Sequence, residues 1–346
     1  MKTLFFVWGA VLLLTACGGG RQEAGSVGVQ PIRTDSLVLP ETLFLGHVCQ
    51  VRVYDSVLYI WDLRNPSMML AVAYPSLETL CSFLPKGKGP EEMLEIGGFD
   101  ADDRYLYVMA SREPKLAIYA QDSLRAGIQR PLRMVACPNE VAPSFAFAKG
   151  GGDTLILQNA RPNRRVLLCD TAGHLLRAQY PMPENEETQN IEPLLMPYLW
   201  MSRMACREGR VALVTRLGEV LEICDPADTV QAVVVVGRDG IPGFTPEGVM
   251  GRVNGFMDVR IFGGKVFAVY SGMSMQEVDR MLDEKGYAPS GGRYFRVYDL
   301  SAGELERVYE LDRYISSFDI LPDGRTVIAA DPTSEHQLCT FTLPEW

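Results

Sequence analysis

The stretch Gly255–Tyr270, GFMDVRIFGGKVFAVY, places two apolar segments on either side of a Gly-Gly pair. Asp-Gly, Glu-Gly and Gly-Gly pairs between apolar segments are typical of β-hairpin turns, because these residues tolerate positive φ. The same pattern occurs in residues 49–62, 97–108, 145–157, 204–214 and 316–330. Its turns fall near residues 55, 103, 152, 209, 264 and 324, at intervals of 48, 49, 57, 55 and 60 residues. This period matches one four-stranded blade of a β-propeller.

Further strands follow each hairpin. Apolar segments that end in an acid, such as VLLCD at Asp170 and FRVYD at Asp299, precede a turn and another apolar segment. Runs such as QAVVVVG at 231–237 indicate strands that are covered on both faces. No single blade can bury both of its faces alone. The sequence therefore predicts an all-β fold, a six-bladed β-propeller with four-stranded antiparallel blades and short helical insertions, in one domain over residues 30–346.

Closure of the ring needs one more strand. The final segment, HQLCTFTL at 336–343, leaves the last repeat one strand short of a full blade. Residues Ser36–Leu45, SLVLPETLFL, precede the first hairpin and are predicted to supply this outer strand. An N-terminal strand that completes the C-terminal blade protects the edges of the ring.

The N-terminus indicates a cell compartment. Lys2 precedes an apolar run at 4–14 that suits a signal peptide and is too short to span a membrane. Leu14-Thr15-Ala16-Cys17, followed by three glycines, resembles the lipobox of bacterial lipoproteins. The resemblance implies a signal peptide at 1–16, lipidation at Cys17, a flexible tether at 17–29 and a membrane anchor in the Gram-negative cell envelope, at the outer membrane. The alternative is a chance cysteine after an ordinary signal peptide.

Composition excludes one class of partner. The formal net charge is −10 and no basic run is present, so nucleic acid is not an expected partner. Seven cysteines remain besides Cys17, an odd number, and none forms a CxxC or Cys/His cluster. We expect most of them to be small buried apolar residues; the sequence leaves open whether one or two disulfides form.

Residues Lys86–Met93, KGKGPEEM, form a glycine-rich basic loop. A nucleotide-binding P-loop requires GK followed by Ser or Thr, and here Lys88 precedes Gly-Pro and two acids that repel a phosphate. The motif resembles the G-x-G-P-x-E motif of the TolB-like six-bladed β-propeller lipoprotein family of Bacteroidetes. Gly237–Pro242, GRDGIP, is similar to a looser second copy. The resemblance implies the fold and an envelope location, and it transfers no catalytic residue.

The first strand of each propeller blade lines the central channel, where ligands commonly bind. Asp100, Asp258 and Asp319 occupy equivalent positions in three repeats. Three inward carboxylates are a candidate site for Ca²⁺, the one cofactor that the sequence suggests. The alternative is that each aspartate bonds the backbone of a neighbouring blade. Arg52, Arg203 and Arg260 lie nearby in the repeats and either bind an anionic ligand or pair with these aspartates.

Two insertions interrupt the repeats. Residues 184–201 end in the apolar residues Pro197, Tyr198, Trp200 and Met201, which either form an interaction surface or plug the ring. Residues 274–285 are predicted to be helical, with Ser274 as N-cap, Glu277 in a capping box and Gly286 as the stop. Loops that interrupt a regular scaffold often carry specificity.

These observations favour a binding protein over an enzyme. The three histidines are far apart, and neither HExxH nor GxSxG occurs. We expect a lipid-anchored, monomeric envelope propeller that binds a protein, peptide or glycan. The alternative is a metal-dependent hydrolase or lyase that uses the channel aspartates.

Overall fold

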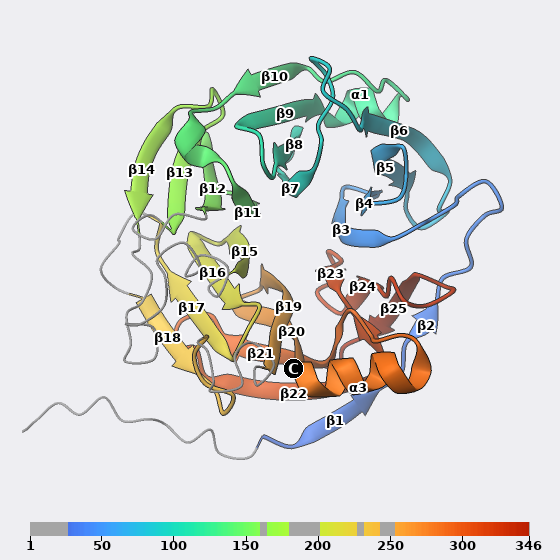
Figure 1. The fold of residues 1–346 in the computed structure, drawn as a ribbon, viewed down its shortest axis with the longest axis vertical. Coiled ribbons are helices and arrows are strands. Elements are labelled where there is room, and N and C mark those ends of the chain that lie inside the picture. Colours follow the sequence, from blue (N-terminus) through green and yellow to red (C-terminus); the bar gives the residue numbers. More distant parts are fainter. Residues whose placement is uncertain (1–26, 160–164, 180–200, 227–231, 243–252, 346) are drawn as a thin grey trace, which may run out of the picture.

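Six small sheets surround a central axis in the computed structural model, which describes residues 27–159, 165–179, 201–226, 232–242 and 253–345 (Figure 1). The first three blades consist of β3 (Val48–Tyr54), β4 (Val57–Asp62), β5 (Ser67–Ala73), β6 (Thr79–Pro85); β7 (Ile96–Ala101), β8 (Tyr105–Ala110), β9 (Lys115–Ala120), β10 (Arg133–Ala136); and β11 (Ser144–Lys149), β12 (Thr154–Asn159), β13 (Val166–Asp170), β14 (Leu175–Gln179). The last three consist of β15 (Ser202–Arg207), β16 (Arg210–Thr215), β17 (Val220–Cys224), β18 (Ala232–Val236); β19 (Val253–Phe262), β20 (Lys265–Ser274), β21 (Gly292–Asp299), β22 (Leu305–Ile315); and β23 (Ser317–Ile320), β24 (Thr326–Ala330), β25 (Leu338–Thr342) with an N-terminal strand. The predicted six-bladed propeller with four-stranded antiparallel blades is confirmed.

The six predicted hairpin turns all join the first and second strands of a blade. Glu208 and Gly209 in one of them have φ of 54° and 70°, the left-handed conformation that such a turn requires. These turns mark one face of the ring, called here the hairpin face. The opposite end, where each fourth strand leads to the next blade, is the loop face.

As predicted, a strand from the N-terminal segment completes the last blade and closes the ring, but its bounds differ from the predicted ones. The closing strand is β2 (Asp35–Ser36), which pairs antiparallel with β25, and the Leu37 N–H adds a bond to the Leu338 carbonyl at 2.9 Å. The predicted strand Ser36–Leu45 does not continue because Pro40 has no N–H to donate, and its carbonyl instead accepts from Leu43 in a turn.

A further edge strand was not predicted. β1 (Val29–Ile32) pairs parallel with β22 and gives the fifth blade a fifth strand (Figure 1). β22 runs from the hairpin face to the loop face, so Val29 lies toward the hairpin face. The N-terminal segment thus covers the outer edges of two neighbouring blades.

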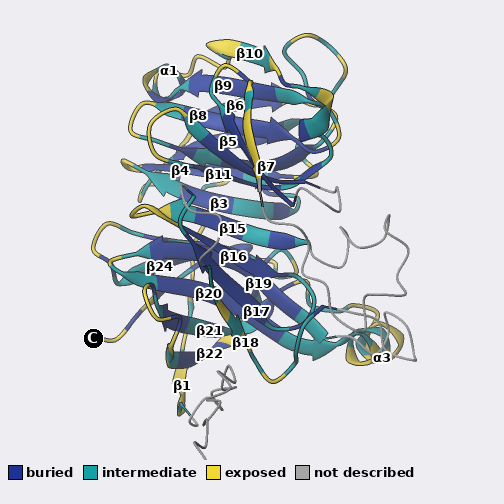
Figure 2. Cartoon of the chain, turned by 90° about the vertical axis from the view of Figure 1, so that its left-hand side faces the viewer, coloured by how far each residue is buried: buried dark blue, intermediate teal, exposed yellow. Residues whose placement is uncertain are grey.

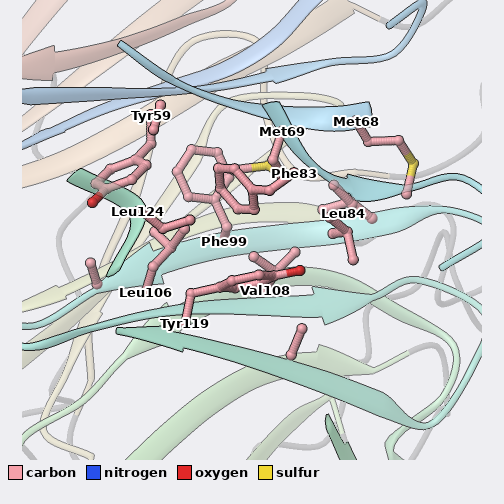
Figure 3. Packing of buried hydrophobic residues seen from close by; sticks show 14 of the residues in the cluster. Tyr59, Met68, Met69, Phe83, Leu84, Phe99, Leu106, Val108, Tyr119 and Leu124 are labelled. Carbon is pink, nitrogen blue, oxygen red and sulfur yellow. The ribbon is translucent and has the colours of Figure 1, made fainter. Parts of the chain in front are cut away.

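The core lies between the blades rather than within any one of them. Figure 2 shows buried residues along the strands and exposed residues in the turns and on α3 (Met275–Lys285). Between the first two blades, Tyr59, Met69, Phe83, Phe99 and Val108 pack in one apolar cluster (Figure 3). Continuous apolar runs are explained by this sandwiching of each sheet between two others.

The inserted helix and the cysteines match their predictions. In α3 the Ser274 hydroxyl and the Glu277 carboxylate form the capping box, and Gly286 ends the helix with φ of 72°. No disulfide joins any of the seven described cysteines, and five of them are buried. Within the described ranges, no helix is long and apolar enough to cross a membrane.

The glycine-rich loop at 86–93 is a structural connection. The Glu92 carboxylate folds back and accepts from the Gly89 N–H at 2.7 Å. Lys115 of the next blade donates to the carbonyls of Gly89 and Glu92 at 3.0 and 2.6 Å. A Cβ added at Gly87 or Gly89 would collide with the Glu92 carboxyl group. The space that a phosphate would need is therefore occupied by a side chain of the motif itself.

The second motif copy makes the same kind of connection with different residues. Glu219 packs against Gly237, where a Cβ would collide with its carboxyl group. Its carboxylate accepts from the Asp239 N–H at 3.2 Å and pairs with Arg296 of the next blade. Both copies therefore join the end of one blade to its neighbour.

Candidate functional site

The three channel aspartates bond the backbone of the next blade. Asp100 accepts from the Lys149 N–H at 2.8 Å, Asp258 from the Phe318 N–H at 3.1 Å, and Asp319 from the Val53 N–H at 2.7 Å. Each also accepts from the N–H of the residue that follows it, at 2.9 to 3.0 Å. At all three positions the aspartate therefore bonds the backbone of a neighbouring blade, which was the alternative to a ligand-binding role.

Two of the predicted arginines pair with these aspartates. Arg52 lies 3.2 Å from Asp258, and Arg260 lies 3.3 Å from Asp258 and 3.5 Å from Asp319. Arg52, Asp258 and Arg260 are all buried. Buried charges of this kind are tolerated because each meets an opposite charge and several hydrogen bonds. The ion-pair network thus closes the centre of the channel.

The aspartates do not fit a calcium site. Ca²⁺ takes six to eight oxygen ligands, whereas the Asp258 oxygens already accept from Ser317, Phe318, Val259 and Arg52. Two guanidinium groups lie where a cation would have to approach. Among the described residues, no three His, Cys, Asp or Glu side chains are grouped to hold a metal.

Burial governs the ionisation of the channel groups. It raises the pKa of Asp100 and of Asp319 above the ordinary carboxyl value, against the opposing effect of their hydrogen bonds and nearby arginines. It also raises the pKa of Tyr54, whose hydroxyl donates to Asp100, well above the ordinary value. Tyr54 therefore stays a neutral donor at physiological pH.

Small cavities flank the ion-pair network on both sides. The cavity toward the hairpin face has a volume of about 30 Å³ and is lined by Tyr54, Asp100, Arg207 and Asp319, among others. The cavity toward the loop face has a volume of about 20 Å³ and is lined by Trp61, Arg203 and Asp258, among others. One water molecule needs about 10–15 Å³ in this measure. Each cavity therefore admits one or two small polar atoms and not a whole ligand.

A much larger hollow opens on the hairpin face, and we call it the interblade cleft. Its volume is about 810 Å³, within the range of small-molecule and peptide pockets. The second, third and fourth blades line it with Asp100, Ala101, Asp102, Asp103, Lys149, Gly150, Gly151, Thr154, Ile156, Leu168, Leu176, Arg177, Cys206, Arg207, Glu208, Gly209, Asp225 and Pro226. The lining mixes charges of both signs with aliphatic side chains, and no aromatic ring is found among the described residues that line it.

The cleft lies where packing between blades is thinnest. The cluster between the third and fourth blades has nine buried apolar residues and no aromatic one among the described residues, against eighteen between the first and second. Polar contacts take their place. Arg165 pairs with Glu222 at 2.6 Å, and Gln158 accepts from the Ser202 N–H at 2.8 Å.

Several predicted site residues fall elsewhere. Cys17, Pro197, Tyr198 and Trp200 lie outside the described residues. Met201 is half-buried, and its carbonyl accepts from the Arg216 N–H at 2.7 Å. Arg203, the third predicted arginine, donates to the Met257 carbonyl at 3.2 Å rather than to a carboxylate.

Sequence reasoning missed Tyr54, Lys149, Arg207 and Arg216. Residues that are two or four positions apart on a strand point to the same face of the sheet. Tyr54 follows Arg52 by two residues and Arg207 follows Arg203 by four, so both could have been predicted to face the channel. Burial lowers the pKa of Arg207, but the nearby charges, those of Asp319 and Asp100 among them, outweigh burial and raise the pKa. No comparable signal marked Arg216, which follows a second strand.

Comparison with known proteins agrees with this geometry. A family model described as TolB-like 6-blade propeller-like matches residues 30–323. The chain belongs to this TolB-like family. A search of curated proteins found no match.

Solved structures share the fold at low sequence identity. A Bacteroides fragilis protein described as exported is 12% identical, with a TM-score of 0.56 and coverage of 94% of this chain and 98% of that one. The RRP9 WD40 repeats are 11% identical, with a TM-score of 0.55 and coverage of 92% and 100%. The Neurospora crassa Pan2 WD40 domain is 12% identical, with a TM-score of 0.52 and coverage of 87% and 90%. At such identities the likeness concerns the fold alone.

Proposed function

We propose that this TolB-like propeller is a lipid-anchored binding module of the bacterial cell envelope, tethered at Cys17 to the outer membrane, that holds a segment of another envelope protein in the interblade cleft. The cleft volume of about 810 Å³ is the observation that carries the proposal. Propellers commonly serve as interaction modules, and rigid blades suit a preformed site.

The lining of the cleft favours a peptide over a glycan. Aliphatic side chains such as Ile156 and Leu176 can contact apolar side chains, while Arg177 and Asp103 can meet charges and backbone groups. A sugar ring commonly stacks on an aromatic side chain, and none lines the cleft in the part of the chain that the structure describes. Leu176 is 57% exposed, an aliphatic side chain available for contact.

The N-terminal end of β1 and the cleft lie on the same face of the ring. The chain enters β1 at the hairpin face, because β1 runs parallel to β22. Cys17 precedes Val29 by twelve residues, which span at most about 40 Å. A ligand in the cleft would therefore be close to the membrane surface.

The metal-dependent hydrolase or lyase has weaker support. Its three carboxylates accept backbone hydrogen bonds and, at Asp258 and Asp319, face arginines. The unfolding temperature, measured with EDTA and with Ca²⁺, distinguishes the binding module from the metal-dependent enzyme. The binding module is expected to unfold at the same temperature in both. A Ca²⁺-dependent rise that Asp319→Asn abolishes would favour the enzyme.

Anchoring is tested by fractionation of cells that express the full chain. The Cys17→Ser variant is expected to leave the membrane fraction, because it cannot be lipidated. Cys49→Ser is the matched control, since Cys49 is a half-buried thiol of the propeller, and it should stay with the membrane. Retention of Cys17→Ser in the membrane fraction would refute the anchor.

Binding in the cleft is tested by photo-crosslinking in cells. Leu176 is replaced by p-benzoylphenylalanine, and Leu132, which is 56% exposed and outside the cleft, receives the same replacement as a control. We expect a discrete protein adduct from position 176 and none from position 132. Equal adducts at both positions, or none at 176, would contradict a ligand in the cleft. A glycan adduct at 176 would contradict a protein ligand and leave the cleft as the site.

A further inference from the structure

The channel is electrically asymmetric. On the hairpin side, Arg207 faces two carboxylates, Asp100 and Asp319. On the loop side, Asp258 is the one carboxylate among the described residues that lines the cavity, and it is already shared by Arg52 and Arg260. Arg203 and Arg216 add two more positive charges there. This end of the channel is therefore net positive, although the whole chain carries a formal charge of −10.

Arg203 and Arg216 have spare hydrogen-bonding capacity. Among the described residues, Arg203 makes one side-chain hydrogen bond, to the Met257 carbonyl, out of five N–H groups. The Arg216 guanidinium makes no hydrogen bond or ion pair within the same part of the chain. Burial first, and then the nearby charge of Arg203, lower the pKa of Arg216 to about 9, with partial relief from Asp258. Both side chains are half-buried, so the loop face can reach them.

A second, independent observation points into the same cavity. Trp61 lines it, and the Trp61 Nε1–H is buried without a hydrogen-bond partner among the described residues. An unsatisfied buried donor is energetically unfavourable, so such groups in native proteins usually meet a water or a ligand. A neutral donor, Trp61, and a guanidinium group, Arg203, thus line one small space, and the positive charge of Arg216 lies near that of Arg203.

We propose that the loop-face end of the channel binds the carboxylate group of a ligand, with Arg203 as the charged donor and the Trp61 indole N–H as a neutral donor. Arg216 adds a positive charge near the site. The cavity of about 20 Å³ has room for one or two oxygen atoms. A planar carboxylate inserts two oxygens into such a space. A sulfate or phosphate carries two further oxygens on the same centre and is therefore bulkier than a planar carboxylate at the mouth of so small a cavity.

This carboxylate site lies opposite the interblade cleft and does not rest on the proposed function. The ligand enters from the loop face, whereas the cleft opens on the hairpin face. A failure of the crosslinking at Leu176 would therefore leave the carboxylate site at Arg203 unaffected. A failure of carboxylate binding would likewise leave the proposed ligand in the cleft unaffected.

The first test observes Trp61 directly in the wild-type protein. In ¹H–¹⁵N spectra, the indole signal that is lost in Trp61→Phe is followed during titration with N-acetylglycine, glucuronate, sulfate and the neutral N-acetylglycinamide. We expect a saturable shift with a carboxylate probe and none with sulfate or the amide. A response to N-acetylglycine alone indicates a peptide carboxylate, and one to glucuronate alone indicates an acidic sugar. No shift with either carboxylate, or an equal shift with sulfate, would overturn the proposal.

The second test measures affinity by calorimetry on folded variants. Arg203→Gln is expected to weaken carboxylate binding by about tenfold or more, because it removes a charge-assisted contact. Arg216→Gln should weaken binding less, because it removes a nearby positive charge and no direct contact. Arg112→Gln is the matched control, since Arg112 is an exposed arginine paired with Glu95 away from the channel. Wild-type affinity in both channel variants, or the same loss in Arg112→Gln, would refute the assignment.

Discussion

Two interfaces between neighbouring blades differ in the side chains that fill them. The interface of the first and second blades is filled by large apolar side chains, with Phe83 and Tyr119 in edge contact at 4.8 Å between ring centres. The interface of the third and fourth blades has small aliphatic residues and a buried Arg165–Glu222 pair. Only the second adjoins a large cleft. A ring can therefore leave one seam thinly packed when the others supply the apolar burial.

The difference also separates stability from binding. A cluster rich in aromatic rings buries more apolar area than one of alanine, valine and leucine side chains. The thinly packed seam gains less from burial, and its polar groups need partners from both blades. We infer that the ligand site lies where the scaffold contributes least to its own stability.

The largest expected effect is at the first interface. Phe99→Ala should lower the free energy of unfolding by about 4 kcal/mol, because it leaves a cavity among fully buried side chains. Chemical denaturation monitored by circular dichroism measures this. Leu132→Ala, at an exposed position, should change it by no more than about 0.5 kcal/mol. A loss below about 1 kcal/mol at Phe99 would show that this interface is not the better packed one.

The next effect is at the second interface. Glu222→Ala should lower the free energy of unfolding by about 3 kcal/mol, since it leaves the Arg165 charge buried without this partner. The double variant Arg165→Met with Glu222→Leu should recover most of the loss, because apolar pairs often replace buried ion pairs without cost. Denaturation of all three proteins decides the matter. A double variant as unstable as Glu222→Ala would mean that the seam requires the ion pair.

The interface of the second and third blades depends on Asp100. Asp100→Asn should cost about 1–3 kcal/mol, because the carboxylate accepts from Lys149, Ala101 and Tyr54. Burial raises the pKa of Asp100. A carboxyl group with a raised folded pKa contributes stability that is present below its unfolded pKa of about 3.9 and is lost as the pH rises through its folded pKa.

The asparagine variant has no such titration. The difference in unfolding free energy between wild type and Asp100→Asn should therefore narrow as the pH rises from about 4 to about 8. Denaturation series at several pH values measure this difference. A difference that widens with pH would mean that the folded protein stabilises the ionised form of Asp100.

The smallest effect on stability is expected inside the cleft. Leu176→Glu should change the free energy of unfolding by no more than about 0.5 kcal/mol, because the side chain is 57% exposed. The same variant should no longer bind the ligand that Leu176 contacts. Co-purification with the partner that the crosslinking experiment identifies would measure this loss. A large loss of stability would assign Leu176 to the core of the seam and remove it from the binding surface.

Much of the fold was readable from local patterns. The hairpin turns, the capping box at Ser274 and the closure of the ring by the N-terminus follow from turn chemistry, capping and the missing strand. The exact bounds of the closing strand could not be predicted, because they depend on its pairing with β25, and Pro40 limits that pairing only once β25 is in place. β1 escaped notice because its pairing partner, β22 of the fifth blade, lies hundreds of residues away in sequence.

The candidate site was only partly readable. Asp100, Asp258 and Asp319 were found from their equivalent places in the repeats, but their use as blade-to-blade acceptors depends on which strand lies beside each one. Arg216 carried no repeat signal, and the interblade cleft has no motif. Both arise from the way that distant strands meet.

Sequence alone determined the repeat, the number of blades and the turn positions, because these depend on residues close together in the chain. Tertiary structure decided which arginines are neutralised and where the ring is hollow. Those properties depend on distances between side chains of different blades, which packing sets only after the ring has closed.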